Sequence, residues 1–405
     1  NAKGYAGGGN DVNGAGPGGA TGTANPCTGQ GGPGGSYGGS GGAGGAGYRT
    51  VGVTYGSLPQ PTDLGSGGTG GDGNCTTGGP GGAGGGAVKL TVSGTLTVNG
   101  TLSANGAAGT TGTWGGGGGG SGGAIWISAG TFAGTGAINA NGGSGGTTTG
   151  GTAGGGGAGG RLALTYTTKT HSGALTAYGG TAPTNAGGAG TLFTKAASAT
   201  NGDLVVDNNN VTGAQTPQTA STTWAVDNLT VKNAAHFVIP SGATFTVATA
   251  LTGTTTNAAL TNNATLSLPN TTLSDFTLTN NGTLTLANAA TLTSVTLTNN
   301  GTLTWPNTVT LTGGTFYHNG TISNAATLNL TLGSGATMEV QNTDATTALG
   351  LASLTIQSGG NLTHKANAAP TILHLSISGS LDLQTGGTIN LNAKGYAGGG
   401  NDVNG

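Results

Sequence analysis

Three similar stretches follow one another in the second half of the chain: LTNNATLSL at Leu260–Leu268, LTNNGTLTL at Leu278–Leu286 and LTNNGTLTW at Leu297–Trp305. A fourth, less regular copy, FYHNGTISN, begins at Phe316, and the steps between copies are 18, 19 and 19 residues. Within each copy leucine and threonine alternate, which is the period of a strand with one buried face. Repeats of this length indicate a solenoid, in which each turn buries its apolar side chains only against the next turn.

If each copy forms one rung, its apolar positions stack into three core columns. The expected columns are Leu260, Leu278, Leu297 and Phe316; Leu266, Leu284, Leu303 and Ile322; and Leu273, Leu292, Leu311 and Leu330. The second asparagine of each polar pair is expected at a corner, because Asn tolerates the left-handed backbone conformation of tight turns. Successive corner side chains should form a hydrogen-bonded ladder along the axis. The ladder residues are Asn263, Asn281, Asn300 and Asn319.

The expected fold is all-β, a right-handed parallel β-helix (β-solenoid) with about 18–19 residues per rung. A left-handed β-helix also has 18-residue rungs, but its strict six-residue signature is absent. Glu, Lys, Arg, Gln and Met, which favour helices, are scarce, whereas Thr, Asn and Gly dominate. This composition favours strands and corners throughout.

Glycine distinguishes the first half: 92 of the 405 residues are Gly, and 70 of these precede residue 200. Short strand-like segments such as LSANG (Leu102–Gly106) and GGAIWI (Gly122–Ile127) enclose Gly-rich runs. We interpret these runs as four excursions from the solenoid. They are either flexible linkers or ordered, polyglycine-II-like packing of extended chains. Order is the preferred interpretation, because excursions anchored in neighbouring rungs would lie in layers.

The charge pattern argues against nucleic acid as a partner. Nine Lys and Arg residues are scattered over the chain, the formal net charge is −2, and no basic stripe is present to neutralise phosphates. No apolar run approaches the roughly 18–20 residues needed to cross a bilayer. We therefore expect no nucleic-acid partner and no membrane span in this segment.

Fourteen residues occur twice: NAKGYAGGGNDVNG is found at Asn1–Gly14 and again at Asn392–Gly405. The simplest interpretation is one period of a tandem array with a 391-residue step. The predicted repeat junction comprises Leu391, Asn392 and Gly395. The predicted segments are a Gly-rich excursion (1–86), rungs with Gly-rich insertions (87–199), a regular Thr/Asn/Leu-rich β-helix (200–391) and the start of the next copy (392–405).

A family resemblance is carried by three Gly-rich segments: GGGGGGSGGAIWI (115–127), GTGAINANGGSGG (134–146) and GGGGAGGRLAL (154–164). They resemble segments of very large, repetitive bacterial surface and secreted proteins, which are similar to β-helix adhesins and fibre proteins. The resemblance covers about residues 80–200, and the Thr/Asn-rich half is similar to β-solenoid adhesins by pattern only. It implies extracellular display and brings no catalytic residues.

Cys27 and Cys75 are the two cysteines, and both lie in the longest Gly-rich excursion. An even pair in an extracellular setting favours a disulfide, with two free thiols as the alternative. Asp203, Asp207 and Asp227 are the nearest approach to an acidic cluster, and we interpret them as solvated corner residues. We expect no catalytic residues, no cofactor and no metal site, and therefore not an enzyme.

Trp305 is expected in the core and Trp114 in a Gly-rich loop, where it would anchor loop packing or a sugar. The expected function is structural: an extracellular or cell-surface fibre repeat that provides a stiff stalk for adhesion, matrix or self-association. Its expected partners are neighbouring copies in tandem, other fibres through Gly-rich faces, and surface glycans. The alternative is a glycan- or ice-binding solenoid that uses outward rows of Thr and Asn.

Overall fold

The computed structural model describes residues 3–21, 28–45, 49–73, 77–183, 185–218, 223–253, 257–269, 271–287, 290–366 and 372–395. The regular elements among these residues are strands and one short 3-10 turn, and none of the residues forms a helix long and apolar enough to cross a membrane. The chain divides into two compact units, Asn1–Ser221 with Val226–Pro240, and Thr222–Ala225 with Ser241–Gly405. The segment before residue 87 therefore shares a unit with residues 87–199.

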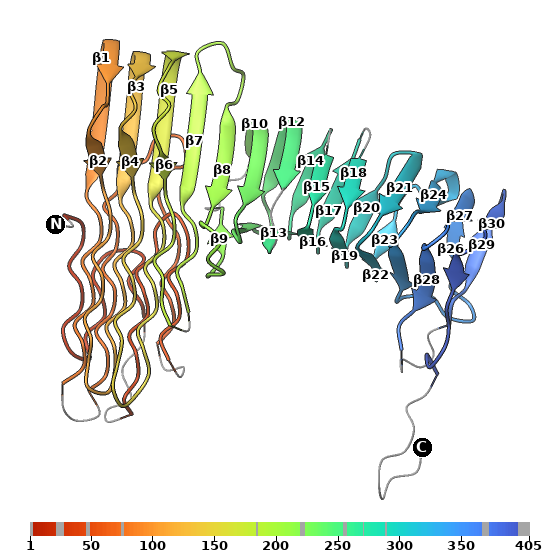
Figure 1. Ribbon diagram of the computed structural model, residues 1–405, viewed down its shortest axis with the longest axis horizontal. Coiled ribbons are helices and arrows are strands. Elements are labelled where there is room, and N and C mark those ends of the chain that lie inside the picture. Colours follow the sequence, from red (N-terminus) through yellow and green to blue (C-terminus); the bar gives the residue numbers. More distant parts are fainter. Residues whose placement is uncertain are drawn as a thin grey trace, which may run out of the picture. The chain divides into compact units, whose positions relative to one another are not determined.

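Two rows of parallel strands organise the first unit (Figure 1). The longer row is β1 (Ala87–Thr97), β3 (Ala124–Ala133), β5 (Arg161–Lys169) and β7 (Thr191–Ala196); the shorter row is β2 (Thr101–Ser103), β4 (Ala137–Asn139) and β6 (Leu175–Thr176). The strands alternate apolar and polar residues, so that Ile125, Ile127 and Phe132 of β3 are buried with Leu162 of β5. Each rung here is long, since Ala87 pairs with Ala124 and Ala124 pairs with Arg161.

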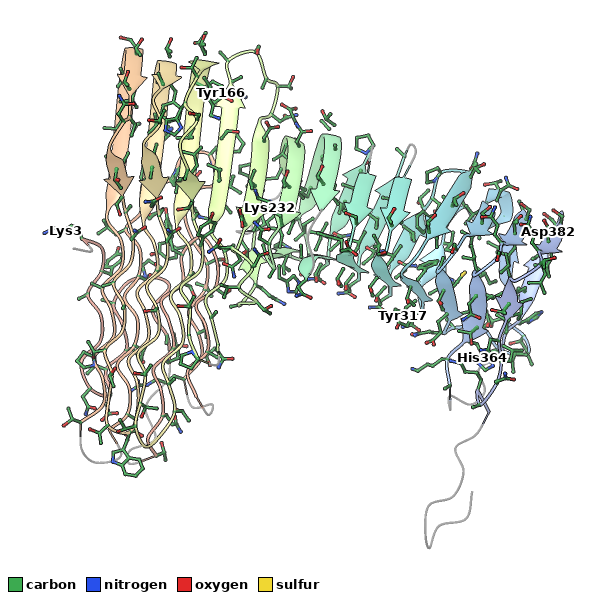
Figure 2. All side chains as sticks on the ribbon, viewed as in Figure 1. Lys3, Tyr166, Lys232, Tyr317, His364 and Asp382 are labelled. Atoms are coloured by element: carbon green, nitrogen blue, oxygen red, sulfur yellow. The ribbon has the colours of Figure 1, made fainter. Side chains whose placement is uncertain are left out.

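The Gly-rich segments account for the extra length of these rungs. Figure 1 shows them side by side beyond the ends of the two strand rows, and Figure 2 shows them carrying few side chains along most of their length. They lie outside regular strands, yet most of their glycines are buried. The 18–19-residue step predicted from the sequence therefore does not apply to this unit.

Among the described strands, one antiparallel pair interrupts the parallel pattern. Strand β8 (Asp203–Asp207) runs opposite to β7, with Leu192 beside Val205, and then pairs in parallel with β10 (Thr223–Lys232). The chain reverses over residues 197–202, and the last of them, Gly202, has a φ of +95°, a conformation that favours glycine. Two short strands, β9 (Thr216–Pro217) and β11 (His236–Ile239), pair in parallel nearby. The sequence pattern did not reveal this reversal.

The second unit is a parallel β-solenoid with three rows of strands. The first row is β13 (Ala258–Asn262), β16 (Phe276–Asn280), β19 (Thr296–Asn299), β22 (Thr315–His318), β25 (Thr337–Val340), β28 (Asn361–His364) and β31 (Thr388–Ile389). The second row is β14 (Thr265–Leu268), β17 (Thr283–Leu286), β20 (Thr302–Thr304) and β23 (Thr321–Ile322). The third row is β15 (Thr271–Ser274), β18 (Ala290–Thr293), β21 (Thr308–Thr312), β24 (Asn329–Leu332), β27 (Ser353–Ile356) and β30 (Leu381–Leu383).

Strand β12 (Thr244–Gly253) pairs with both β14 and β15, and β26 (Leu349–Leu351) pairs with β29 (Leu375–Ile377). All of these pairings are parallel, so the prediction of an all-β parallel solenoid is confirmed. The right-handed sense of the coil stays a prediction.

Two of the three core columns stack as the spacing predicts. The first is Leu260, Leu278, Leu297 and Phe316, and the second is Leu266, Leu284, Leu303 and Ile322. In the third, Leu273, Leu292 and Leu311 are neighbours, but Leu311 pairs with Leu332, and Leu330 pairs with Val309. Placing Leu330 in that column was therefore wrong. The 3-10 turn η1 (Ala325–Thr327) lies in that rung's corner, and the rung is longer than the 19-residue step assumes.

Rungs continue to lengthen toward residue 389. Phe316 pairs with Met338, Met338 with Leu362, and Leu362 with Ile389, so the step grows from 19 to 27 residues. The even step of 18–19 residues thus describes the rungs between Ala258 and His318. The additional residues lie in corners, where loop length costs little free energy.

Candidate functional site

Backbone hydrogen bonds hold the Gly-rich segments together in a three-residue pattern. Along residues 116–123, three successive donors reach three different neighbouring segments. Gly116, Gly119 and Gly122 donate to the carbonyls of residues 152, 155 and 158; Gly117, Gly120 and Gly123 donate to 110, 107 and 104; and Gly118 and Ser121 donate to 69 and 66. We call this set of segments, within residues 3–86, 104–123, 140–160 and 177–190, the glycine array.

Most glycines of the glycine array have no room for a side chain. A Cβ built on Gly118 would lie 2.0 Å from the carbonyl oxygen of Pro33, and one on Gly119 would lie 2.0 Å from that of Gly143. Such contacts are far shorter than ordinary van der Waals separations, and a packed interior cannot open to relieve them cheaply. Glycine is therefore required at these positions by close approach of backbones, and not by a left-handed φ.

Arg161 joins the glycine array to the strands. Arg161 is the first residue of β5, where it pairs with Ala124 of β3 and Thr191 of β7. Its side chain is fully buried. Its Nε donates to the carbonyl of Tyr55 at 2.9 Å, and one Nη donates to the Thr191 hydroxyl at 3.2 Å. Burial lowers the pKa of Arg161, and the guanidinium carbon lies 5.6 Å from the ring centre of buried Tyr37.

The Arg161 contact was not expected from the sequence. A signal was available in residues 49–64, RTVGVTYGSLPQPTDL, which interrupt the glycine with apolar and aromatic residues. Leu58 in this segment is buried, and Tyr55 lies 4.7 Å from Tyr37 between ring centres. The segment thus supplies a small core and the carbonyl that Arg161 needs.

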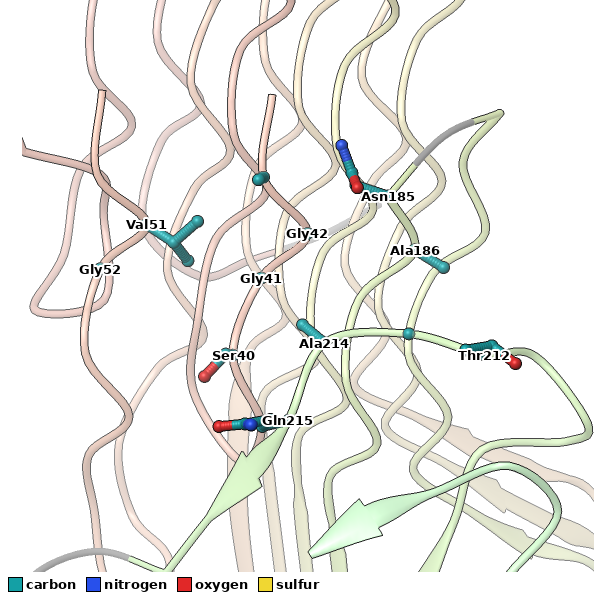
Figure 3. Close-up of a pocket in the computed structure, with 12 residues that line it drawn as sticks. Ser40, Gly41, Gly42, Val51, Gly52, Asn185, Ala186, Thr212, Ala214 and Gln215 are labelled. Carbon is teal, nitrogen blue, oxygen red and sulfur yellow. The ribbon is translucent and has the colours of Figure 1, made fainter. Parts of the chain in front are cut away.

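A shallow groove of about 520 Å³ opens on the glycine array (Figure 3). Ser40, Val51 and Gly52 lie on one side, and Asn185, Thr212 and Gln215 contribute from the other segments (Figure 3). Its walls offer small side chains, amides and backbone groups, and no ionisable residue lines it. Across the described residues, no three His, Cys, Asp or Glu side chains gather into a metal-binding group.

The predicted corner ladder lies on the surface of the second unit. Asn281 Nδ2 donates to Asn263 Oδ1 at 2.7 Å, Asn300 donates to Asn281 at 2.8 Å, and Asn319 donates to Asn300 at 3.4 Å. We call these four residues the outer ladder. Because its side chains are exposed, water competes for each of these bonds.

A second ladder, which we did not predict from the sequence, lies one residue earlier in each Asn pair. Asn262, Asn280 and Asn299 are fully buried, and each donates to the next Asn Oδ1 or to a Thr carbonyl of a neighbouring rung. We call these three residues the inner ladder. The signal was present in the paired Asn itself, since alternation places the first Asn of each pair on the leucine face.

His318 takes the next position after the inner ladder. It pairs with Asn299 across the strands and is 2% exposed, and its Nδ1 has no hydrogen-bond partner. Burial lowers the pKa of His318 to about 4, because the apolar surroundings disfavour the charged imidazolium. The neutral ring is therefore the form that the folded chain holds.

The three aspartates that we interpreted as solvated corner residues lie instead in strands, Asp203 and Asp207 in β8 and Asp227 in β10, and each has a structural role. Asp227 accepts hydrogen bonds from the backbone N–H groups of Asn201 and Gly202, which lower its pKa, and so stabilises the β7–β8 reversal. Asp203 accepts from Asn228, and Asp207 pairs with Lys232 at 3.4 Å.

Of the two tryptophans considered above, Trp305 is buried against Phe316, whereas Trp114 is 38% exposed. Cys27 and Cys75 lie outside the described residues. Their disulfide stays a prediction.

We predict that Asn280→Ala destabilises the chain by about 2 to 4 kcal/mol, because it leaves buried donors and acceptors of Asn262 and Asn299 unpaired. The matched control is Asn281→Ala in the outer ladder, which should cost about 0.5 kcal/mol or less. Chemical denaturation of both variants measures the difference. Equal losses in the free energy of unfolding would show that the inner ladder contributes no more to stability than the outer ladder does.

We predict that His318 makes stability depend on pH in a defined window. The unfolded chain binds a proton near its ordinary pKa of about 6.5, whereas the folded chain does so only near pH 4. Stability is thus full above pH 6.5 and falls by about 1.4 kcal/mol per pH unit as the pH drops toward 4. His318→Asn should remove this part of the slope in denaturation curves. An unchanged slope would assign the effect to other histidines.

We predict that Gly118→Ala disrupts the glycine array at a cost of about 3 kcal/mol or more, since its methyl group would overlap the Pro33 carbonyl. The control is Gly100→Ala, because a Cβ there meets nothing within 4 Å. Hydrogen exchange at residues 104–123 should accelerate in the first variant alone. Retained protection in Gly118→Ala would contradict the close packing.

Comparison with known proteins identifies no relative: no family model, no curated protein and no solved structure matches this chain.

Proposed function

We propose that this chain is a repeat unit of an extracellular or cell-surface fibre, in which tandem β-solenoid copies form a stiff stalk. The stalk would serve adhesion, matrix formation or self-association, and the chain would not be an enzyme. The proposal rests on one observation about the duplicated fourteen residues, and on the mechanical properties that the two units imply.

Residues 3–14 of the first duplicated segment are part of the folded glycine array. The Gly4 N–H donates to the Gly84 carbonyl at 2.8 Å, Gly8 donates to Gly68 at 2.9 Å, and Asp11 donates to Gly71 at 3.2 Å. A Cβ on Gly7 would lie 2.0 Å from the Gly81 carbonyl oxygen. This segment needs residues 65–85 beside it, so its recurrence at Asn392–Gly405 supports a following copy that supplies them.

The two units suit a load-bearing rod. In the solenoid, each rung is bound to the next by backbone hydrogen bonds along three rows, and stability adds from rung to rung. We propose that the glycine array packs as polyglycine II, with extended three-residue helices side by side. Only 5% of the residues are charged, so salt would change such a rod little.

The expected partners follow from these surfaces. Neighbouring copies are joined covalently in tandem, and other fibres could pack laterally on the Gly-rich faces. The first unit offers apolar contacts for lateral packing or for surface glycans at three exposed residues, Val12, Val53 and Trp114. An oxidising exterior would also suit a Cys27–Cys75 disulfide. We also propose that the chain is related to the giant repetitive surface proteins that its Gly-rich segments resemble.

The alternative function is recognition of glycans or ice by outward threonines. Thr244, Thr265, Thr283, Thr302 and Thr321 form one continuous column across β12, β14, β17, β20 and β23. Ice binding needs one flat, regular threonine face. Threonine rows also occur on other faces, for example Thr277, Thr296 and Thr315. The alternation of Leu and Thr in each strand is enough to produce such rows. A thermal-hysteresis assay tests this alternative, and a depressed freezing point would favour it over the stalk.

We predict that high-resolution cryo-electron microscopy of the native assembly shows a filament with strands stacked at about 4.8 Å and Gly-rich segments ordered along one side. The expected repeat contains 391 residues. Separate globular particles joined by structureless segments would overturn the stalk. Function would then have to be sought on the surface of each particle.

A further inference from the structure

The last described rung ends in an uncovered apolar edge. Leu381 and Leu383 of β30 are 48% and 50% exposed, although their partners Leu354 and Ile356 in the preceding rung are fully buried. Leu391, just beyond β31, is 47% exposed. Solenoid ends in soluble proteins normally carry a polar cap. Within the described residues this edge has none, so it presents core positions ready for another rung.

The first long strand has the same property on its opposite side. Val88, Leu90 and Leu96 of β1 are only partly buried, whereas Ile125, Ile127 and Phe132, beside them in β3, are at most 1% exposed. Among the described residues, β3 is the only strand that pairs with β1. The first strand is therefore an open edge as well.

The two edges match in sequence along eleven residues. LHLSISGSLDL at Leu373–Leu383 spans β29 and β30, and VKLTVSGTLTV at Val88–Val98 covers β1 from its second residue and the residue that follows it. All five apolar positions coincide, and the Ser-Gly step falls at the same place, Ser378-Gly379 and Ser93-Gly94. Successive strands in each row of this fold carry matching patterns of this kind when they are in-register neighbours.

The path of the chain brings these edges together in a tandem protein. A groove of about 660 Å³ lies beside β1, lined by Lys3, Leu64, Val88 and Leu102 among others. Residues 392–394 repeat residues 1–3, so Leu391 of one copy precedes the Lys3 equivalent of the next by three positions. An extended span of three residues covers at most about 11 Å. The exposed Leu391 is thus delivered to the mouth of this groove, which both apolar and polar residues line.

From these observations we infer that the β29–β30 edge of one copy pairs in parallel and in register with β1 of the next copy. Leu375 lies beside Leu90, Ile377 beside Val92 and Leu381 beside Leu96, and the segment at Leu391 fills the groove beside β1. The occupant of both open edges is therefore a second copy of this chain. This inference rests on the tandem arrangement proposed above, and adds the surface and register by which copies join.

The test uses a two-copy chain, residues 1–391 followed by residues 1–405, with Ser376→Cys in the first copy and Thr91→Cys in the second. Both positions are exposed, and in-register neighbours lie about 5 Å apart, within reach of a disulfide. The control pairs Ser376→Cys with Thr95→Cys, about 13 Å further along the strand. Peptide mapping should find the 376–91 disulfide and not the 376–95 one. Equal yields, or neither disulfide, would overturn the register.

A second pair of variants keeps the inference testable without cysteines. Leu383→Asn in the first copy should lower the melting temperature of the two-copy chain, because the side chain would be buried at the junction. The same substitution in the second copy leaves the residue at an open edge, and should have a much smaller effect. Equal effects would contradict stacking. If microscopy shows a continuous rod while both tests fail, the stalk survives and this junction does not.

Discussion

Parallel, in-register stacking is the constraint on which the solenoid depends. A parallel ladder sets neighbouring backbones about 4.8 Å apart, and so places each side chain directly over its equivalent in the next rung. Leucine over leucine forms a dry core, and asparagine over asparagine forms a hydrogen-bonded ladder. The repetition in the sequence follows from this geometry, since a residue that suits one rung suits its neighbours.

Close backbone stacking has a different consequence where most residues are glycine. In the glycine array, backbones approach on all sides, and donors at successive residues reach different neighbours. The array gains hydrogen bonds and dispersion contacts, whereas the solenoid gains mainly buried apolar surface. Arg161 connects the two kinds of packing in the first unit, because its buried guanidinium bonds to the Tyr55 carbonyl beyond the strand row. Losing that side chain would leave buried polar groups without partners.

Stacking also explains which sequence-based predictions were confirmed and which were wrong. Columns such as Leu260 to Phe316 were predictable, because their spacing is even and alternation assigns the inward face. Leu330 was misplaced because a 3-10 turn lies in the corner before it, and corner length leaves no periodic trace. The buried Asn280 was overlooked although alternation itself placed it inward. The loop at residues 197–202 reverses the chain, and an Asn-Gly pair at its end was the signal available in the sequence.

The sequence by itself determined the strand-rich fold and the faces of the regular rungs, and it favoured ordered packing of the Gly-rich half over flexible linkers. These properties are local or periodic, so the residue composition and the spacing of the apolar residues predict them. Only the tertiary structure decided which Gly-rich segments lie side by side, that Arg161 reaches Tyr55, and that the strands reverse between β7 and β8. Those outcomes depend on contacts between residues far apart in the chain, where many pairings of similar glycine segments satisfy the same sequence pattern.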